Sequence, residues 1–126
     1  MALRLFVLLM CVLCVGCQSR ETLVEEFVSK QLKDPHTAQF SEIRTHPSEY
    51  FAVSCGIVNS KNSFGAYAGP TKFLVAYGRV IFEDPSVTES LDSCCSFMLA
   101  YDPSADSDRL PSTDSAFPAS CKMHGL

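Results

Sequence analysis

The chain lacks several features that would point to common classes of protein. It has no cluster of Lys or Arg, which argues against nucleic acid as a partner, because binding to phosphates requires concentrated positive charge. Its 3 histidines lie in different segments, and no serine lies in a Gly-x-Ser-x-Gly motif. Its 14 carboxylates include no pair that the sequence places in a cleft. We therefore expect a protein that is not an enzyme and that uses no cofactor or metal ion.

The chain also lacks an apolar run long enough to span a bilayer. The run from Leu5 to Val15 follows Arg4 and is shorter than the about 20 residues that a spanning helix needs. A positive residue before a short apolar stretch is typical of a secretory signal. The end of the run, Leu13-Cys14-Val15-Gly16-Cys17, resembles the lipobox of bacterial lipoproteins. That resemblance implies cleavage after residue 16 and lipidation of Cys17, with diacylglyceryl and an N-acyl chain such as palmitate. An ordinary secretory signal that is cut nearby is the alternative.

A lipid at Cys17 would define where the protein resides. Several acyl chains hold a protein on a membrane almost permanently, because each buried methylene contributes roughly 0.8 kcal/mol. Gln18 after the cysteine, rather than Asp, resembles lipoproteins that are sent to the outer membrane. We expect a signal peptide over residues 1–16, a lipid-anchored linker over 17–21, and a location in the bacterial envelope, on the outer membrane and facing the periplasm. Removal of Arg4 with the signal changes the net charge from −4 to −5.

Four cysteines remain after the anchor, namely Cys55, Cys94, Cys95 and Cys121. In an oxidising compartment they predict two disulfides. A bridge between adjacent cysteines is strained, since consecutive Cα atoms lie about 3.8 Å apart and disulfides favour about 4.4 to 6.8 Å. We therefore expect Cys55 to pair with one member of the doublet and Cys121 with the other. A metal site that these cysteines share with His124 is the alternative, which the oxidising compartment and the lack of a Cys-x-x-Cys motif among these four cysteines disfavour.

Residues 22–101 have the pattern of one small domain. Thr22 to Glu25 has the form of a capping box, and Leu23, Val24, Phe27, Val28 and Leu32 follow at helical spacing, which predicts an amphipathic helix ending before Pro35. Strands are predicted over residues 40–43, 49–59, 71–77 and 80–83, with a tight turn at Gly78-Arg79 between the last two. Asp84-Pro85 predicts a further helical turn, and residues 97–101 predict a last strand.

These elements predict an α+β fold. An N-terminal amphipathic helix would pack on an antiparallel sheet of three to four strands, and disulfides would stabilise a core that is small for independent stability. Residues 102–126 are rich in Ser, Asp and Pro, so they have little apolar surface to bury. We expect them to form a polar tail that Cys121 ties back to the domain.

Two motifs resemble those of a known family. Residues 33–40 resemble a KDPxSAxF box, and residues 55–69 resemble a CGxVNxKNxFGxYxG box. Together they resemble a family of small exported proteins of bacteria and their phages, over roughly residues 22–82. The resemblance implies a helix followed by a small antiparallel sheet, and it implies no established activity.

The second motif ends in a loop with two glycines, and this loop is the candidate binding site. It presents five side chains, those of Asn59, Lys61, Asn62, Phe64 and Tyr67. Rigid rings supply contact area and amides supply directional hydrogen bonds, as a recognition surface requires. In the alternative interpretation, Phe64 and Tyr67 fold back to cap the core, the asparagines satisfy their own turn, and Lys61 is an ordinary surface charge.

These observations predict a membrane-anchored envelope lipoprotein that acts by binding. Its expected partners are the membrane, reached through the lipid, and an envelope protein. One rival is a lipoprotein of a phage or mobile element that blocks a receptor or pore and so excludes a second infection. Another is an inhibitor of a wall-degrading enzyme, whose active-site cleft the loop would enter. A structural role in an envelope assembly predicts stable co-purification with an integral membrane protein.

Overall fold

The computed structural model describes residues 19–48, 52–101 and 118–126. In chain order the elements are helix α2 (Arg20–Ser29), the 3-10 turn η2 (Pro35–Thr37), strands β1 (Gln39–Thr45), β2 (Ser54–Asn59), β3 (Thr71–Ala76) and β4 (Arg79–Phe82), and helices α3 (Leu91–Ala100) and α4 (Ala119–Met123). The four strands form one antiparallel sheet in the order β1-β2-β3-β4. The predicted α+β class and antiparallel sheet are therefore confirmed. The predicted signal peptide, Cys17 and most of the predicted polar tail lie outside the described residues.

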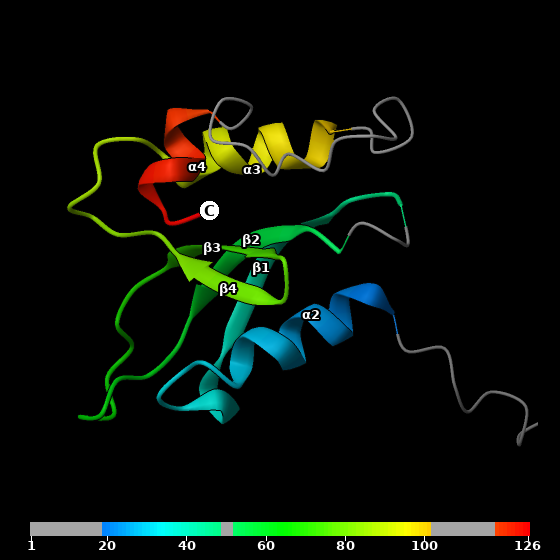
Figure 1. The fold of residues 1–126 in the computed structure, drawn as a ribbon. Helices are drawn as coiled ribbons and strands as arrows, with labels where there is room; N and C mark the ends of the chain where they lie inside the picture. Colours follow the sequence, from blue (N-terminus) through cyan, green and yellow to red (C-terminus); the bar gives the residue numbers. More distant parts are fainter. Residues whose placement is uncertain (1–18, 49–51, 102–117) are drawn as a thin grey trace, which may run out of the picture.

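The sheet lies between two helical layers, with α2 on one side and α3 and α4 on the other (Figure 1). Strand β3 shows how the sequence builds both layers, because successive side chains of a strand point to opposite faces. Phe73 and Val75 belong to the cluster that includes Val28 of α2. Leu74 and Ala76 belong to the larger cluster that includes the buried side chains of α3. Burial on both faces explains why β3 reads as a continuous apolar run rather than an alternating one.

Helix α2 begins earlier and ends earlier than the pattern predicted. Its N-cap is Ser19, whose Oγ accepts a hydrogen bond from the backbone N–H of Thr22 at 3.3 Å, so the capping box predicted at Thr22 is wrong. The helix ends at Ser29, and the chain then turns into η2, where Pro35 occupies the first position. The turn forms before the chain reaches Pro35, so proline does not set the end of the helix.

Fewer side chains of α2 are buried than its amphipathic sequence pattern predicts. Val28 is fully buried and Val24 packs beside it, whereas Leu23 is 50% exposed and Phe27 is 36% exposed. The helix contacts the sheet along one narrow line, so only side chains four residues apart on that line reach the core. On the solvent side, Glu26 forms an ion pair with Lys30 at 2.9 Å, and this pair holds the pKa of Glu26 below its usual value. An ion pair at this i, i+4 spacing is an ordinary feature of a solvated helix face, so we do not assign it to a binding site.

Strand β1 is longer than predicted. Strand β2 begins only at Ser54, because Ala52 and Val53 are described but are not part of a strand, so the strand predicted over residues 49–59 is wrong at those two positions; residues 49–51 lie outside the described residues. The register of β1 against β2 shifts between Ser41 and Arg44, and Glu42 in this bulge has a φ of 54°. The hairpin between β3 and β4 turns at Tyr77-Gly78 rather than at the predicted Gly78-Arg79. Both turn residues have positive φ, 51° and 71°, which the two-residue type I′ turn of a hairpin requires.

Asp84 ends the sheet in a turn and does not start the predicted helix. Its Oδ1 accepts hydrogen bonds from the backbone N–H of Ser86 at 2.8 Å and from the Ser86 hydroxyl at 2.7 Å. These two bonds hold the pKa of Asp84 below its usual value. Such local bonds compete with helix formation, so the helix begins only at Leu91, after Ser90 caps the N–H of Asp92 at 3.2 Å.

Helix α3 replaces the strand that was predicted over residues 97–101. Its buried residues are Leu91, Cys94, Cys95 and Met98. They recur at the i, i+3, i+4, i+7 spacing of one helical face, which is a signal that the sequence carries. The apolar run at its end can form either a strand or a buried helix, and the spacing of the upstream residues decides for the helix.

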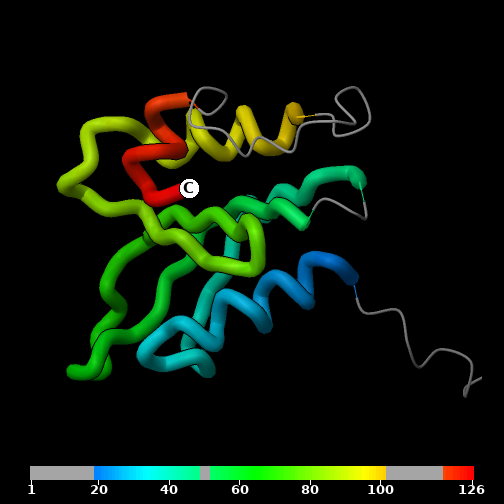
Figure 2. The backbone as a smooth tube through the Cα atoms, in the orientation of Figure 1, coloured from blue at the N-terminus to red at the C-terminus, as the bar shows by residue number. Residues whose placement is uncertain are grey.

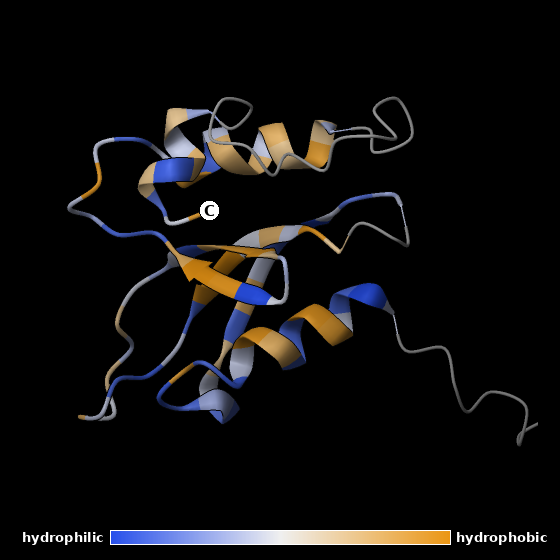
Figure 3. Ribbon diagram, viewed as in Figure 1, coloured by the Kyte–Doolittle hydropathy of each residue, from blue (hydrophilic) through white to orange (hydrophobic). Residues whose placement is uncertain are grey.

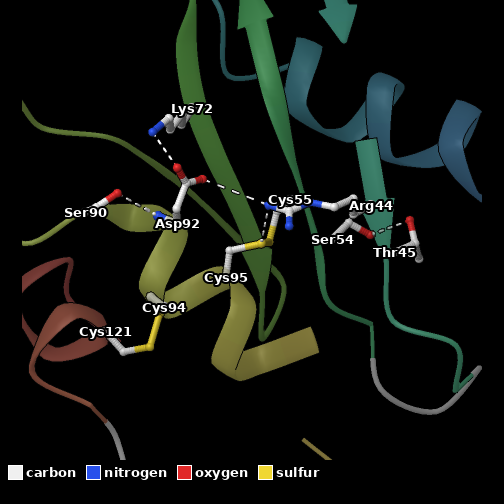
Figure 4. The surroundings of a disulfide bond; sticks show 10 residues. All are labelled: Arg44, Thr45, Ser54, Cys55, Lys72, Ser90, Asp92, Cys94, Cys95 and Cys121. Carbon is white, nitrogen blue, oxygen red and sulfur yellow. Dashed lines mark hydrogen bonds and ion pairs between the residues drawn. A yellow bond between two sulfur atoms is a disulfide. The ribbon is translucent and has the colours of Figure 1, made fainter. Parts of the chain in front are cut away.

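Two disulfides connect α3 to its neighbours (Figure 4). Cys55 of β2 is bonded to Cys95, with Cα atoms 6.2 Å apart, and Cys94 is bonded to Cys121 of α4, with Cα atoms 4.9 Å apart. Adjacent helical residues point about 100° apart, so Cys95 faces the sheet while Cys94 faces α4. The prediction that the doublet is shared between Cys55 and Cys121 is confirmed, and the structure gives the connectivity.

The last nine residues belong to the folded domain rather than to a polar tail. Cys121 is fully buried in the core, and Leu126 packs against the same cluster. The disulfide to Cys94 brings this short segment onto α3, where it buries apolar surface that it could not bury alone. Apolar residues mark the central strands, and hydrophilic residues are frequent in the connecting loops (Figure 3). In the three described ranges no helix has the length and apolar character needed to cross a membrane.

Candidate binding site

The chain between β2 and β3 projects from the sheet as a narrow hairpin, residues 59–70, which we call the finger (Figure 2). An isolated antiparallel bridge joins Lys61 to Tyr67, beyond the end of the regular strands. Further toward the tip, the backbone N–H of Asn62 donates to the carbonyl of Ala66 at 2.8 Å. The finger is therefore a hydrogen-bonded hairpin of defined shape that extends beyond the β2–β3 ladder.

The two asparagines of the finger hold its backbone. Oδ1 of Asn62 accepts hydrogen bonds from the N–H groups of Phe64 at 2.9 Å and Ala66 at 3.3 Å. Oδ1 of Asn59 accepts a hydrogen bond from the N–H of Gly69 at 3.1 Å, across the base of the hairpin. The asparagine oxygens thus form the local backbone bonds that the alternative interpretation expects, and these bonds shape the finger.

The aromatic residues of the finger do not plug the core. Phe64 is 95% exposed at the turn, beside Gly65, which has a φ of 79°. Tyr67 is 45% exposed, and its hydroxyl accepts a hydrogen bond from Nε2 of Gln39 at 3.1 Å. The ammonium of Lys61 lies 5.6 Å from the Tyr67 ring centroid, which is a cation–π distance. Phe64 therefore presents its ring to solvent, while Tyr67 helps to fix one side of the finger.

The two sequence motifs meet at the base of the finger. The backbone N–H of Lys61 donates to Oγ1 of Thr37 at 3.0 Å, and the Thr37 hydroxyl donates to the carbonyl of Asp34 at 3.1 Å. The bond from Gln39 to Tyr67 is a second link between the same two segments. The segment around η2 thus braces the finger, which limits how far its tip can move relative to the sheet.

A hollow of about 280 Å³ lies between the base of the finger and the turn that follows α2. Leu32, Val58 and Phe82 give it an apolar lining, and Lys33 and Lys61 also line it, with no Asp or Glu. A second hollow, of about 410 Å³, is lined by Glu83, Asp84 and Glu89 and by no Lys or Arg. The two hollows share Thr71, so surfaces of opposite charge lie next to each other.

Other charged groups form a network around the first disulfide (Figure 4). Nζ of Lys72 lies 2.6 Å from a carboxylate oxygen of Asp92 and 3.9 Å from Glu83, and the hydrogen bond to Asp92 raises the pKa of Lys72 above its usual value. Nη2 of Arg44 lies 4.0 Å from Asp92 and 3.4 Å from Sγ of Cys95. This network joins β1, β3 and α3, so we assign it to the fold rather than to a site.

The residues that could have formed a Cys/His pair or a metal site are engaged elsewhere. Cys55 is in a disulfide and has no thiol for a histidine to activate. His46 is buried, its Nδ1 accepts from the N–H of Ser48 at 3.1 Å, and its Nε2 therefore donates to the carbonyl of Tyr101 at 2.7 Å. His124 lies 2.9 Å from the carbonyl of Glu89. Within the described ranges no three His, Cys, Asp or Glu side chains are grouped to hold a metal ion.

No protein-family model matches this chain, and neither a curated protein nor a solved structure is significantly similar to it. What the finger and the hollow can bind is therefore inferred from their own geometry. The sequence indicated the finger but not the hollow, because Leu32, Val58 and Phe82 come from three segments and none of them stands out in its own segment. Lys33 reads from the sequence as an ordinary solvated charge.

Proposed function

We propose that the protein is a lipid-anchored lipoprotein of the bacterial envelope that binds an envelope protein through the finger. The observation that carries this proposal is Phe64, whose ring is 95% exposed on a braced hairpin. An exposed ring contributes almost nothing to the stability of its own fold, because it buries no area. A rigid aromatic side chain that is free to be covered is the usual anchor of a protein–protein interface.

The proposed anchor at Cys17 restricts where the partner can be. Helix α2 starts at Arg20, three residues after Cys17, so the connecting chain spans at most about 11 Å. With this tether the domain would remain next to the membrane surface, and Phe64 would reach only partners in the membrane or close to it. An integral membrane protein or another envelope-attached protein is therefore the partner that we expect.

The test is crosslinking in intact cells, followed by pull-down in detergent of the full-length protein. We expect one envelope protein to be recovered with the wild type, to be strongly reduced with Cys17→Ser, and to be lost with Phe64→Ala. Met123 on α4 is 54% exposed, so Met123→Ala is a matched control that removes an exposed apolar side chain elsewhere. Recovery of no protein, or equal loss with both alanine variants, would count against the proposal.

The narrow shape of the finger favours inhibition of a wall-degrading enzyme as a second candidate function. A hairpin with an aromatic tip has the form of a group that enters an active-site cleft. Lysozyme activity measured with the wild type and with Phe64→Ala tests this candidate directly. Inhibition that disappears with Phe64→Ala would support it, and unchanged lysozyme activity in the presence of excess wild type would reject it for that enzyme.

Exclusion of a second phage infection would be a consequence of the same binding act. If the envelope partner is a receptor or a pore, a finger that covers it would block entry. Infection efficiency in cells that express the wild type or Phe64→Ala distinguishes this role from binding that leaves infection unchanged.

A further inference from the structure

Three lysines stand apart from the other cations that the structure describes. Five cationic side chains bond to carboxylates or backbone carbonyls, namely Arg20, Lys30, Arg44, Lys72 and Arg79. In the described part of the chain, the ammonium groups of Lys33, Lys61 and Lys122 form no ion pair and no hydrogen bond. Two of these three, Lys33 and Lys61, line the same hollow beside the finger.

The hollow combines apolar lining with positive charge that no carboxylate neutralises, although the Lys61 ammonium also lies 5.6 Å from the Tyr67 ring centroid. Leu32, Val58 and Phe82 line it, and it contains no carboxylate, although the chain as a whole has a net charge of −4. Its volume of about 280 Å³ lies just below the range of small-molecule pockets, about 300–1,000 Å³. A hollow of this size fits one or two side chains rather than a cofactor.

We propose that this hollow receives an acidic segment of the protein partner, with an apolar side chain entering the hollow and a neighbouring carboxylate pairing with Lys33 and Lys61. This inference rests on the proposed function and specifies the chemistry of the partner. The carboxylates of the adjacent hollow, Glu83, Asp84 and Glu89, would repel the same segment and so fix the direction in which it lies. The partner is then held at two places, at the tip by Phe64 and at the base by this hollow.

A direct test measures peptide binding to the full-length lipoprotein in phosphatidylcholine nanodiscs. The probe is a fluorescent tetrapeptide amide in which Leu-Phe is flanked by Asp and Glu. The control peptide is identical except that it carries Lys at both flanking positions. We expect the acidic peptide to bind about tenfold more tightly than the basic one, which is the size that two solvent-exposed ion pairs supply. Equal binding of the two peptides, or tighter binding of the basic one, would overturn the inference.

Reversing the charge of individual lysines shows which of them produce the preference for the acidic peptide. Lys33→Glu combined with Lys61→Glu should remove the preference for the acidic peptide, whereas Lys122→Glu on α4 should retain it. All three side chains lie at least partly in solvent, so the variants should keep the wild-type thermal unfolding. If the double variant does not fold, Lys33→Gln combined with Lys61→Gln takes its place. An equal effect of Lys122→Glu would overturn the inference by showing that net charge alone is responsible.

Two further outcomes separate this inference from the proposed function. If phosphatidylglycerol vesicles bind through Lys33 and Lys61 and the acidic peptide does not, the hollow serves lipid headgroups and the inference is wrong. In the cellular pull-down, loss of the partner with Phe64→Ala but not with Lys33→Glu/Lys61→Glu would retain the proposed function and reject the acidic contact. Failure of every form to recover a partner would reject the proposed function itself.

Discussion

Replacing Phe64 with alanine separates a binding role of the finger from a folding role. Because Phe64 is 95% exposed, only about 5% of a side-chain area of roughly 200 Å² leaves water on folding. At about 25 cal/mol per Å², this burial contributes about 0.3 kcal/mol to the free energy of unfolding. Phe73, which is 1% exposed in the core, provides the contrast, since Phe→Ala at such a site costs about 3–5 kcal/mol.

The same ring has its whole area available for a partner. Covering about 190 Å² of Phe64 would contribute up to about 5 kcal/mol before the costs of association. Truncation of an interface anchor typically costs about 2–4 kcal/mol, so Phe64→Ala should weaken binding at least about 30-fold. The variant should thus lose the partner while keeping its fold.

Thermal unfolding by circular dichroism and in-cell capture measure the two effects side by side. In a domain of this size 1 kcal/mol shifts the Tm by about 4–8 °C, so Phe64→Ala should lower the Tm by less than about 3 °C. Capture of the envelope partner should fall below detection. A fall in Tm of about 10 °C would show that the ring supports the fold, and unchanged capture would remove Phe64 from the interface.

Three further predictions concern the fold that carries the finger. Replacing Cys55 and Cys95 together by serine opens a bridge with a sequence separation of 40, and the unfolding free energy in urea should fall by about 4 kcal/mol; a loss under 1 kcal/mol would contradict the entropic argument. Gly56→Ala places a Cβ 2.8 Å from a ring carbon of β3, so it should cost about 1–3 kcal/mol in the same assay, and a neutral result would mean that the sheet adjusts freely. The pKa of Lys72 is raised in the folded protein, mainly by its hydrogen bond to Asp92, so its contribution is full below the unfolded pKa of about 10.4 and is lost as the pH rises through the folded value. Between about pH 9 and about pH 11, on either side of that pKa, the free energy of unfolding of Lys72→Met should therefore fall less than that of the wild type. An identical decline in the two proteins would refute the assignment.

Much of the fold could be predicted from local pattern, and the largest error has a physical reason. The strands were predicted because β-branched and aromatic residues cluster between turn residues. Residues 97–101 form a short apolar run, and such a run does not distinguish a strand from a buried helix. The helical spacing of Leu91, Cys94, Cys95 and Met98 resolves this, but it is visible only when cysteines are counted as core residues.

The finger could be located from its motif, but the roles within it could not. Asn59 and Asn62 were expected as contact groups, and the structure uses their side-chain oxygens to close the hairpin. The base and one side of the finger are held by hydrogen bonds to Thr37 and Gln39, which lie in a different segment. Sequence spacing does not encode a contact of this kind, so only the folded chain shows which residue of the motif is available for binding.

The most direct test of a membrane-tethered finger is photocrosslinking from position 64 itself. The full-length protein carries p-benzoylphenylalanine in place of Phe64, and a matched form carries it in place of Met123, which is 54% exposed on α4. After irradiation of intact cells, we expect position 64 to yield one crosslinked envelope protein, position 123 to yield none, and Cys17→Ser to reduce the crosslink sharply. The same crosslinks from both positions, or none from position 64, would contradict the proposal that the finger binds a partner.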